Sequence, residues 1–100
     1  MKNNLFVITL IYKAPLEKVD EFRKEHLEFV DTYYKNGLFM VSGPQVPRIG
    51  GVIIARSNDI LVLKDVLSKD PFIINNLAEY QIIEFNPTRC IPELENIVEK

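Results

Sequence analysis

Residues 5–12 read Leu-Phe-Val-Ile-Thr-Leu-Ile-Tyr, and this stretch decides the fold class. It is rich in β-branched and aromatic residues and too short for a helix, so it predicts a β-strand. Its two alternating sets of side chains, one starting at Leu5 and the other at Phe6, are both largely apolar. One layer of helices covers one face of a sheet, so we expect a second copy of the same sheet to cover the other face.

The residues that follow this strand predict helices and three more strands. Pro15 suits the first turn of a helix and Gly37 suits its end, so a helix is expected from Pro15 to about Asn36. The further elements expected are strands over 38–42, 52–56 and 79–86, a helix over 59–68 capped by Ser57 or Asn58, a short helix or turn from Asp70-Pro71, and a C-terminal helix from Pro92. The order β-α-β-β-α-β is the ferredoxin-like α+β arrangement, an antiparallel sheet with helices on one face.

Composition and charge narrow the class of protein. With 47% hydrophobic and 26% charged side chains, residues 1–100 are expected to form a single globular domain. A net charge of −2 disfavours nucleic acid as a partner, because phosphate binding requires a basic surface. No apolar run approaches the roughly 20 residues of a membrane span. The apolar N-terminal stretch lacks a small-residue cleavage site, so a cytoplasmic protein is expected. Cys90 is the only cysteine, which excludes an internal disulfide and a cysteine-based metal site.

His26 is the only histidine, and it falls at the centre of the apolar side of the first expected helix. At about 100° per residue, five hydrophobic side chains share that side: Val19, Phe22, Phe29, Val30 and Tyr33. An imidazole that points inward needs a hydrogen-bond partner. The pattern therefore indicates either a histidine satisfied within the core or the ionisable group of a functional site.

Asp70 is the candidate partner of His26. Asp-Pro is also what capping alone would select, since aspartate accepts hydrogen bonds from free N–H groups and proline fits the first helical position. A carboxylate against His26 would fix the imidazole tautomer and strengthen it as a base. One histidine without a nearby second ligand does not make a metal site, so no metal is expected.

Two polar side chains are candidates for holding a ligand. Ser42 is expected on the strand face of Leu38 and Met40, just before Gly43-Pro44, where it either lines a pocket or satisfies a turn. Arg23 lies one turn before His26 and either contacts an anionic ligand or pairs with an acidic neighbour, Asp20 or Glu84. The four tyrosines, Tyr12, Tyr33, Tyr34 and Tyr80, are expected as core and interface rings.

Several separated motifs together resemble the YciI-like (YCII-related) family. They are Arg23-x-x-His26-Leu27, Gly37-x-x-x-x-Ser42-Gly43-Pro44, Asp70-Pro71-Phe72 and the hydrophobic strand 80–85. The resemblance extends from about Leu5 to Pro87. It implies a ferredoxin-like fold that dimerises through its sheet faces into a dimeric α/β barrel, as in muconolactone isomerase.

The resemblance also implies a site. A His–Asp pair, which maps to His26 and Asp70, is the catalytic candidate, and the ligand-binding candidates are Arg23, Ser42, Gly43 and Pro44. The sequence departs from the family pattern at Asn75-Asn76, where the family has a small residue and glycine, and in the proline- and glycine-containing loop over 45–51. The amide side chains at 75 and 76 are expected to change what the pocket accepts.

Three functions are consistent with these residues. The first is a lyase or isomerase without a cofactor, similar to the family's dehydrochlorinase for a chlorinated hydroxyhydroquinone, which would act on a small cyclic or aromatic metabolite. Proton transfer by one positioned histidine supplies roughly 10²–10⁴-fold in rate. The alternatives are a non-catalytic module that binds a small molecule and a structural role with a merely buried His26.

Overall fold

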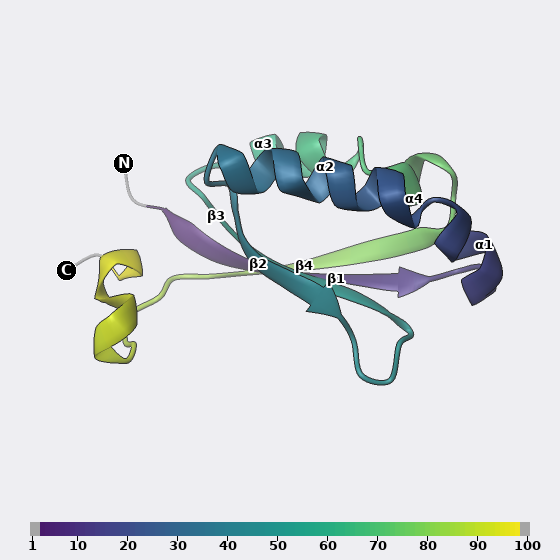
Figure 1. The fold of residues 1–100 in the computed structure, drawn as a ribbon. Coiled ribbons are helices and arrows are strands. Elements are labelled where there is room, and N and C mark those ends of the chain that lie inside the picture. Colours follow the sequence, from purple (N-terminus) through teal and green to yellow (C-terminus); the bar gives the residue numbers. More distant parts are fainter. Residues whose placement is uncertain (1–2, 99–100) are drawn as a thin grey trace.

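The computed structural model of the protein describes residues 3–98 and has one four-stranded sheet with helices on one of its faces (Figure 1). The elements in chain order are β1 (Asn4–Tyr12), α1 (Leu16–Glu21), α2 (Arg23–Lys35), β2 (Phe39–Pro44), β3 (Gly50–Ser57), α3 (Ile60–Leu67), α4 (Pro71–Ile74), β4 (Ala78–Phe85) and the 3₁₀ helix η1 (Pro92–Ile97). Within residues 3–98, no helix has both the length and the apolar character needed to cross a membrane.

The sheet has the strand order β2-β3-β1-β4, and every neighbouring pair is antiparallel. Strand β1 is central, paired with β3 on one side and β4 on the other. This is the ferredoxin-like βαββαβ topology, so the predicted fold class is confirmed. The topology also brings α4 against α2, although the two helices are separated by two strands and a helix in sequence.

The core lies between the sheet and the helices. Phe6 and Ile8 of β1 are fully buried, and so are Leu63 of α3 and Val19 of α1. Full burial of each such side chain contributes about 1.5–3 kcal/mol relative to exposure. The alternating residues of β1 that face the helices are therefore the main anchors of the helical layer.

Gly50 brings the β2–β3 loop close to the end of β1. A Cβ atom at this position would lie 1.7 Å from the carbonyl oxygen of Leu10, so no other residue fits without moving the backbone. Beside it, the N–H of Tyr12 donates to the carbonyl of Ile49 at 2.9 Å. The loop over 45–49 is thus fixed next to the C-terminal end of β1.

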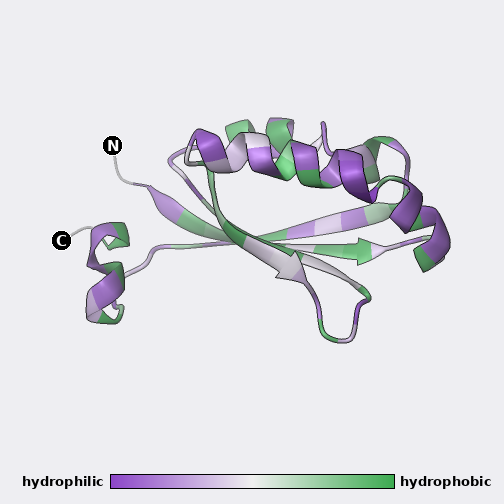
Figure 2. Ribbon diagram, in the orientation of Figure 1, coloured by the Kyte–Doolittle hydropathy of each residue, from purple (hydrophilic) through white to green (hydrophobic). Residues whose placement is uncertain are grey.

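The face of the sheet away from the helices is apolar too. The strand register places Val7 opposite both Ile54 and Ile83, and Ile54 opposite Val41. These four residues, the outer-face row, cross all four strands, and Val41 and Ile83 are 57% and 61% exposed. Figure 2 shows hydrophobic residues along the central strands and mixed colouring on the helices. The two-sided apolar character expected from residues 5–12 is therefore present across the sheet.

The structure corrects two of the predicted helix boundaries. The helix expected from Pro15 to Asn36 is interrupted at Phe22 (φ −111°, ψ 7°), which separates α1 from α2. Phe22 is neither proline nor glycine, and its side chain packs against the core, so tertiary packing overrides local helix propensity here. Helix α3 is capped by Asp59, which accepts from the N–H of Leu61, and not by Ser57 or Asn58.

Candidate functional site

Two side chains from different helices meet at the centre of the candidate site. His26 lies near the N-terminal end of α2, and its Nδ1 is 2.8 Å from Oδ1 of Asp70, the N-cap residue of α4. The side chain of His26 is 16% exposed and that of Asp70 is 0% exposed. The predicted contact between the two residues is confirmed.

Asp70 also caps its own helix. Its Oδ1 accepts a hydrogen bond from the N–H of Phe72 at 2.9 Å, so the capping and pairing alternatives hold together. Its Oδ2 is buried and has no hydrogen-bond partner within the described chain. Capping requires only that one side-chain oxygen lie at the helix end. It does not require the complete burial of the Asp70 carboxylate, which carries a desolvation cost.

Two contacts orient the imidazole of His26, a hydrogen bond to Asp70 and stacking on Phe72. An ionised Asp70 accepts through Oδ1, so Nδ1 carries a hydrogen, and in the neutral imidazole Nε2 then keeps its lone pair. The ring also stacks on Phe72, with the centroids 4.0 Å apart and the planes at 9°. No group of residues 3–98 forms a hydrogen bond with Nε2 in the structure. This ring nitrogen is therefore the one available to a ligand.

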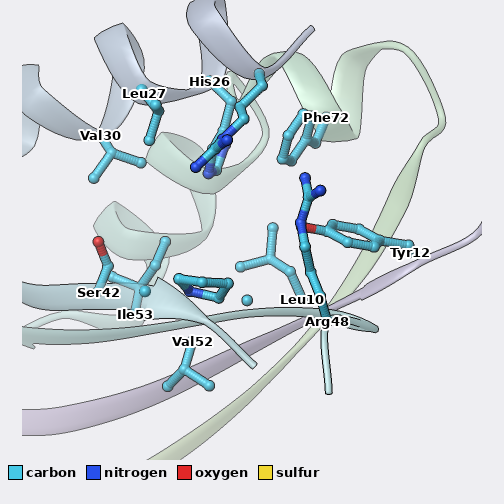
Figure 3. Close-up of a pocket in the computed structure, with 14 residues that line it drawn as sticks. Leu10, Tyr12, His26, Leu27, Val30, Ser42, Arg48, Val52, Ile53 and Phe72 are labelled. Atoms are coloured by element: carbon cyan, nitrogen blue, oxygen red, sulfur yellow. The ribbon is translucent and has the colours of Figure 1, made fainter. Parts of the chain in front are cut away.

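A cavity of about 80 Å³ lies beside the imidazole, between α2 and the ends of β1, β2 and β3. Figure 3 shows the ring of His26 projecting into it, with Leu27 and Phe72 on either side. The other predicted site residues that line it are Arg23, Ser42, Gly43 and Pro44, and its apolar wall includes Leu10, Leu27, Val30, Ile53 and Phe72. The sequence candidates other than Asp70 thus line one cavity, and Asp70 contacts the imidazole of His26 without lining it.

Ser42 reaches this cavity by a route that the sequence did not predict. The register of β2 shifts between Phe39, which faces Ala55, and Val41, which faces Ile54. This irregularity puts Ser42 opposite the buried Ile53, on the helix side of the sheet together with Phe39, so the simple alternation expected along 38–42 is interrupted. The hydroxyl of Ser42 forms a hydrogen bond with that of Tyr34 on α2.

Arg48, in the loop between β2 and β3, is a pocket residue that sequence reasoning missed. Its guanidinium is 2.6 Å from Oδ1 of Asp20, which lies on α1, and 5.7 Å from the ring centre of Tyr12. The Tyr12 ring, expected only as a core or interface ring, also lines the cavity. The one signal in the sequence was a basic residue within the loop over 45–51, where the chain departs from the family pattern. Hydrophobic periodicity does not predict the direction of a side chain in a loop, so this signal did not place Arg48 in the pocket.

The charges of Asp20 and Arg48 stabilise each other. The hydrogen bond from Arg48 lowers the pKa of the Asp20 carboxyl against the opposing effect of desolvation, and the charges of Arg48 and Arg23 add to the lowering. The same pair raises the pKa of Arg48, with a further contribution from Tyr12. Arg23 is in neither of its two expected ion pairs among the described residues, since Asp20 binds Arg48 and Glu84 accepts from Asn4.

The two asparagines expected to alter the pocket lie outside its lining. Asn76 adopts the left-handed conformation (φ 58°) in place of the family's glycine, and its Oδ1 accepts from Lys13 Nζ at 2.6 Å. Asn75 donates to the carbonyl of Pro71. They shape the turn after α4, and neither of the two side chains contacts the cavity directly. No group of three or more His, Cys, Asp or Glu side chains that could hold a metal ion is found within residues 3–98.

The fold and the site define a class of small ferredoxin-like α+β domain with a cavity beside a buried His–Asp pair. Two solved structures are similar. The 5-chloro-2-hydroxyhydroquinone dehydrochlorinase of Burkholderia phenoliruptrix, in complex with 2,5-dihydroxybenzoquinone, matches with a TM-score of 0.71 at 16% identity, over 81% of this chain and 92% of that chain. A variant of SnoaB, a cofactor-independent oxygenase from Streptomyces nogalater, matches with a TM-score of 0.52 at 13% identity, over 92% of this chain and 99% of that chain. At these identities the likeness establishes the fold alone.

The family is established by the sequence. The family model of the YCII-related domain matches residues 5–86, and the chain belongs to this family. The resemblance drawn from the Arg23, Ser42 and Asp70 motifs is therefore confirmed. Comparison with the curated proteins gives no match.

Proposed function

We propose that the cavity beside His26 is the active site of a cofactor-independent lyase or isomerase that acts on a small cyclic or aromatic metabolite. The observation that supports this most strongly is the 2.8 Å contact between Nδ1 of His26 and the fully buried Asp70. It leaves Nε2 as a proton acceptor at the wall of a cavity lined mainly by apolar groups. That combination is typical of a general base with an orienting carboxylate.

The proposed chemistry begins with proton transfer from the ligand to Nε2 of His26. In an elimination, the electron pair of the broken C–H or O–H bond forms a new double bond while a leaving group departs with its own electron pair. The imidazolium that results is stabilised by the Asp70 carboxylate and returns its proton to solvent. In an isomerisation, the same proton is returned to another carbon. Neither sequence of steps requires an oxidant or a reductant.

The comparisons support the choice of a ring as the ligand. The similar dehydrochlorinase is bound to 2,5-dihydroxybenzoquinone, a small oxygenated ring. In this chain, the apolar groups Leu27 and Ile53 and the aromatic Phe72 line the cavity. Such walls suit the faces of a flat ring, while Ser42 offers a hydroxyl for a ring substituent.

The test is turnover of hydroxylated and chlorinated rings, beginning with 5-chloro-2-hydroxyhydroquinone, followed by NMR of the reaction mixture. We expect the parent protein to release chloride or to rearrange at least one ring, and we expect His26→Gln to lose about 10²-fold or more in rate. Thr32→Val, an exposed change elsewhere on α2, is the control and should keep full activity. A His26 variant that retains the rate would contradict the role of His26 as a base.

The alternative function is a binding module, in which the same cavity of about 80 Å³ holds a small molecule without turning it over. Binding without turnover would appear as a ligand-dependent rise in the melting temperature with no product. That result would support the proposed ligand pocket and contradict the proposed enzymatic activity.

We further propose that the protein is a homodimer in which the outer-face rows of two sheets pack together. The row Val7, Val41, Ile54 and Ile83 is apolar, and two of its members are more than half exposed. A second copy offers the same apolar surface and covers both rows in one symmetric contact. This arrangement corresponds to the dimeric α/β barrel that the family resemblance implies.

A further inference from the structure

Arg48 is placed at the solvent side of the cavity. Its side chain is 31% exposed, whereas that of His26 is 16% exposed. Figure 3 shows its side chain reaching up from the β2–β3 loop beside Tyr12, toward the level of Phe72. The hydrogen bond between Tyr12 and Ile49 holds the backbone of the loop that carries Arg48 beside the end of β1.

The planar fork of Arg48 is shaped for a carboxylate and is bound to one. Nη2 lies 2.6 Å from Oδ1 of Asp20, and Nη1 lies 3.5 Å from Oδ2. The Asp20 side chain is 49% exposed, and ion pairs this exposed to solvent contribute little to stability. A second carboxylate of suitable geometry can therefore replace Asp20 at small cost.

The cavity has a positive side. Arg23 and Arg48 both line it, whereas no Asp or Glu of the described chain does. Asp70 lies behind the imidazole and Asp20 lies beyond the guanidinium. An anionic substituent that reaches the mouth thus meets two guanidinium groups, and its main competitor is the carboxylate of Asp20.

We propose that Arg48 anchors a carboxylate on the ring bound beside His26, and that Asp20 competes with this ligand for the same guanidinium. This inference rests on the proposed function and names the substrate class, which is a cyclic or aromatic acid. The size of the cavity supports it. Its volume of about 80 Å³ is roughly half of an apolar cavity known to take benzene, so part of a ring ligand must project toward the mouth where Arg48 lies.

The experiment compares two probes that differ by one carboxylate, 2,5-dihydroxybenzoate and 1,4-dihydroxybenzene, by calorimetric titration. The acid should bind the parent protein more tightly than the neutral ring. Arg48→Gln should weaken binding of the acid about tenfold or more and leave the neutral ring unchanged. Arg48→Lys should give an intermediate loss, because it keeps the charge without the fork. Asp20→Asn should strengthen binding of the acid about two- to fivefold by removing the competitor.

Arg89→Gln is the matched control, since Arg89 is exposed and lies outside the cavity, and it should change neither affinity. The melting temperature of each variant confirms that it is folded. If Arg48→Gln affects both probes equally or neither, the anchor is rejected while the pocket stands. If Asp20→Asn weakens binding of the acid, Asp20 positions Arg48 and the competition is rejected. If neither probe binds the parent protein, the ring-binding pocket of the proposed function fails, and the anchor fails with it.

Discussion

Oδ1 of Asp70 lies 2.8 Å from Nδ1 of His26, and through the same atom Asp70 accepts the hydrogen bond that begins helix α4. One oxygen therefore fixes both the start of a helix and the orientation of an imidazole on another helix. This sharing makes the geometry of the candidate base depend on the packing of α4 against α2. The energetic consequences of the pair are open to measurement.

Replacing Asp70 by alanine should destabilise the protein more than removal of a simple cap does. Asp59 is the comparison, because it caps α3 through the N–H of Leu61 and contacts no histidine in the structure. We expect Asp59→Ala to lower the free energy of unfolding by about 1 kcal/mol. Asp70→Ala should lower it by about 2–4 kcal/mol, since the imidazole also loses its partner. Urea unfolding measures both. Equal losses would make Asp70 a cap and nothing more.

The energies of His26 and Asp70 should be coupled. A leucine at position 26 suits the apolar side of α2 but leaves the buried carboxylate without its histidine, so we expect His26→Leu to cost about 1–3 kcal/mol. Asp70→Asn keeps a side chain that can cap α4 and removes the charge. In a double-mutant cycle, Asp70→Asn should lower the free energy of unfolding by about 1 kcal/mol less in His26→Leu than in the parent protein. Additive losses would show that the two side chains do not interact.

The outer-face row should hold the dimer together. We expect the parent protein to sediment as a dimer at micromolar concentration and Ile83→Asp to sediment as a folded monomer, because the charge is placed in the apolar contact. Leu61→Asp is the matched control on α3, where the leucine is 69% exposed, and it should remain dimeric. A parent protein that is a stable monomer would refute the proposed assembly, and so would an Ile83→Asp variant that still dimerises.

The ion pair between Asp20 and Arg48 should be lost in acid. Its hydrogen bond lowers the pKa of Asp20 below the ordinary 3.8, so the pair contributes its stabilisation above that value. The contribution disappears as the pH falls through the lowered pKa and the carboxylate protonates. We expect the side-chain Nε resonance of Arg48 to stay constant above pH 3.8 and to move below it. In Asp20→Asn this movement should be absent. An Arg48 resonance that moves equally in both proteins would show that another group causes it.

The sequence predicts the order of elements well, because hydrophobic runs, prolines and glycines mark them. The strand Leu5–Tyr12 is observed as Asn4–Tyr12, with one residue added. The break at Phe22 and the irregular register before Ser42 were not predicted, since both depend on how the elements pack and neither leaves a proline or glycine at the position.

The part of the candidate site that lies on helices could be predicted from the sequence. His26 and Asp70 lie on helices whose placement follows from the ferredoxin-like topology, so their approach could be expected. Arg48 projects from a loop, and its position follows from the close contact of Gly50 with the Leu10 carbonyl and from the pairing with Asp20. Tertiary contacts of this kind have no periodic signature in the sequence.

The central claim is that Nε2 of His26 is the free base of a ligand pocket, and ¹⁵N NMR of histidine-labelled protein tests it most directly. With one histidine in the chain, the spectrum contains a single pair of ring resonances. Above the pH at which the imidazole titrates in the same spectra, we predict a hydrogen on Nδ1 and none on Nε2, with the Nε2 resonance shifting when 2,5-dihydroxybenzoate or 1,4-dihydroxybenzene is added. A hydrogen on Nε2, or ring resonances that neither compound moves, would contradict the account.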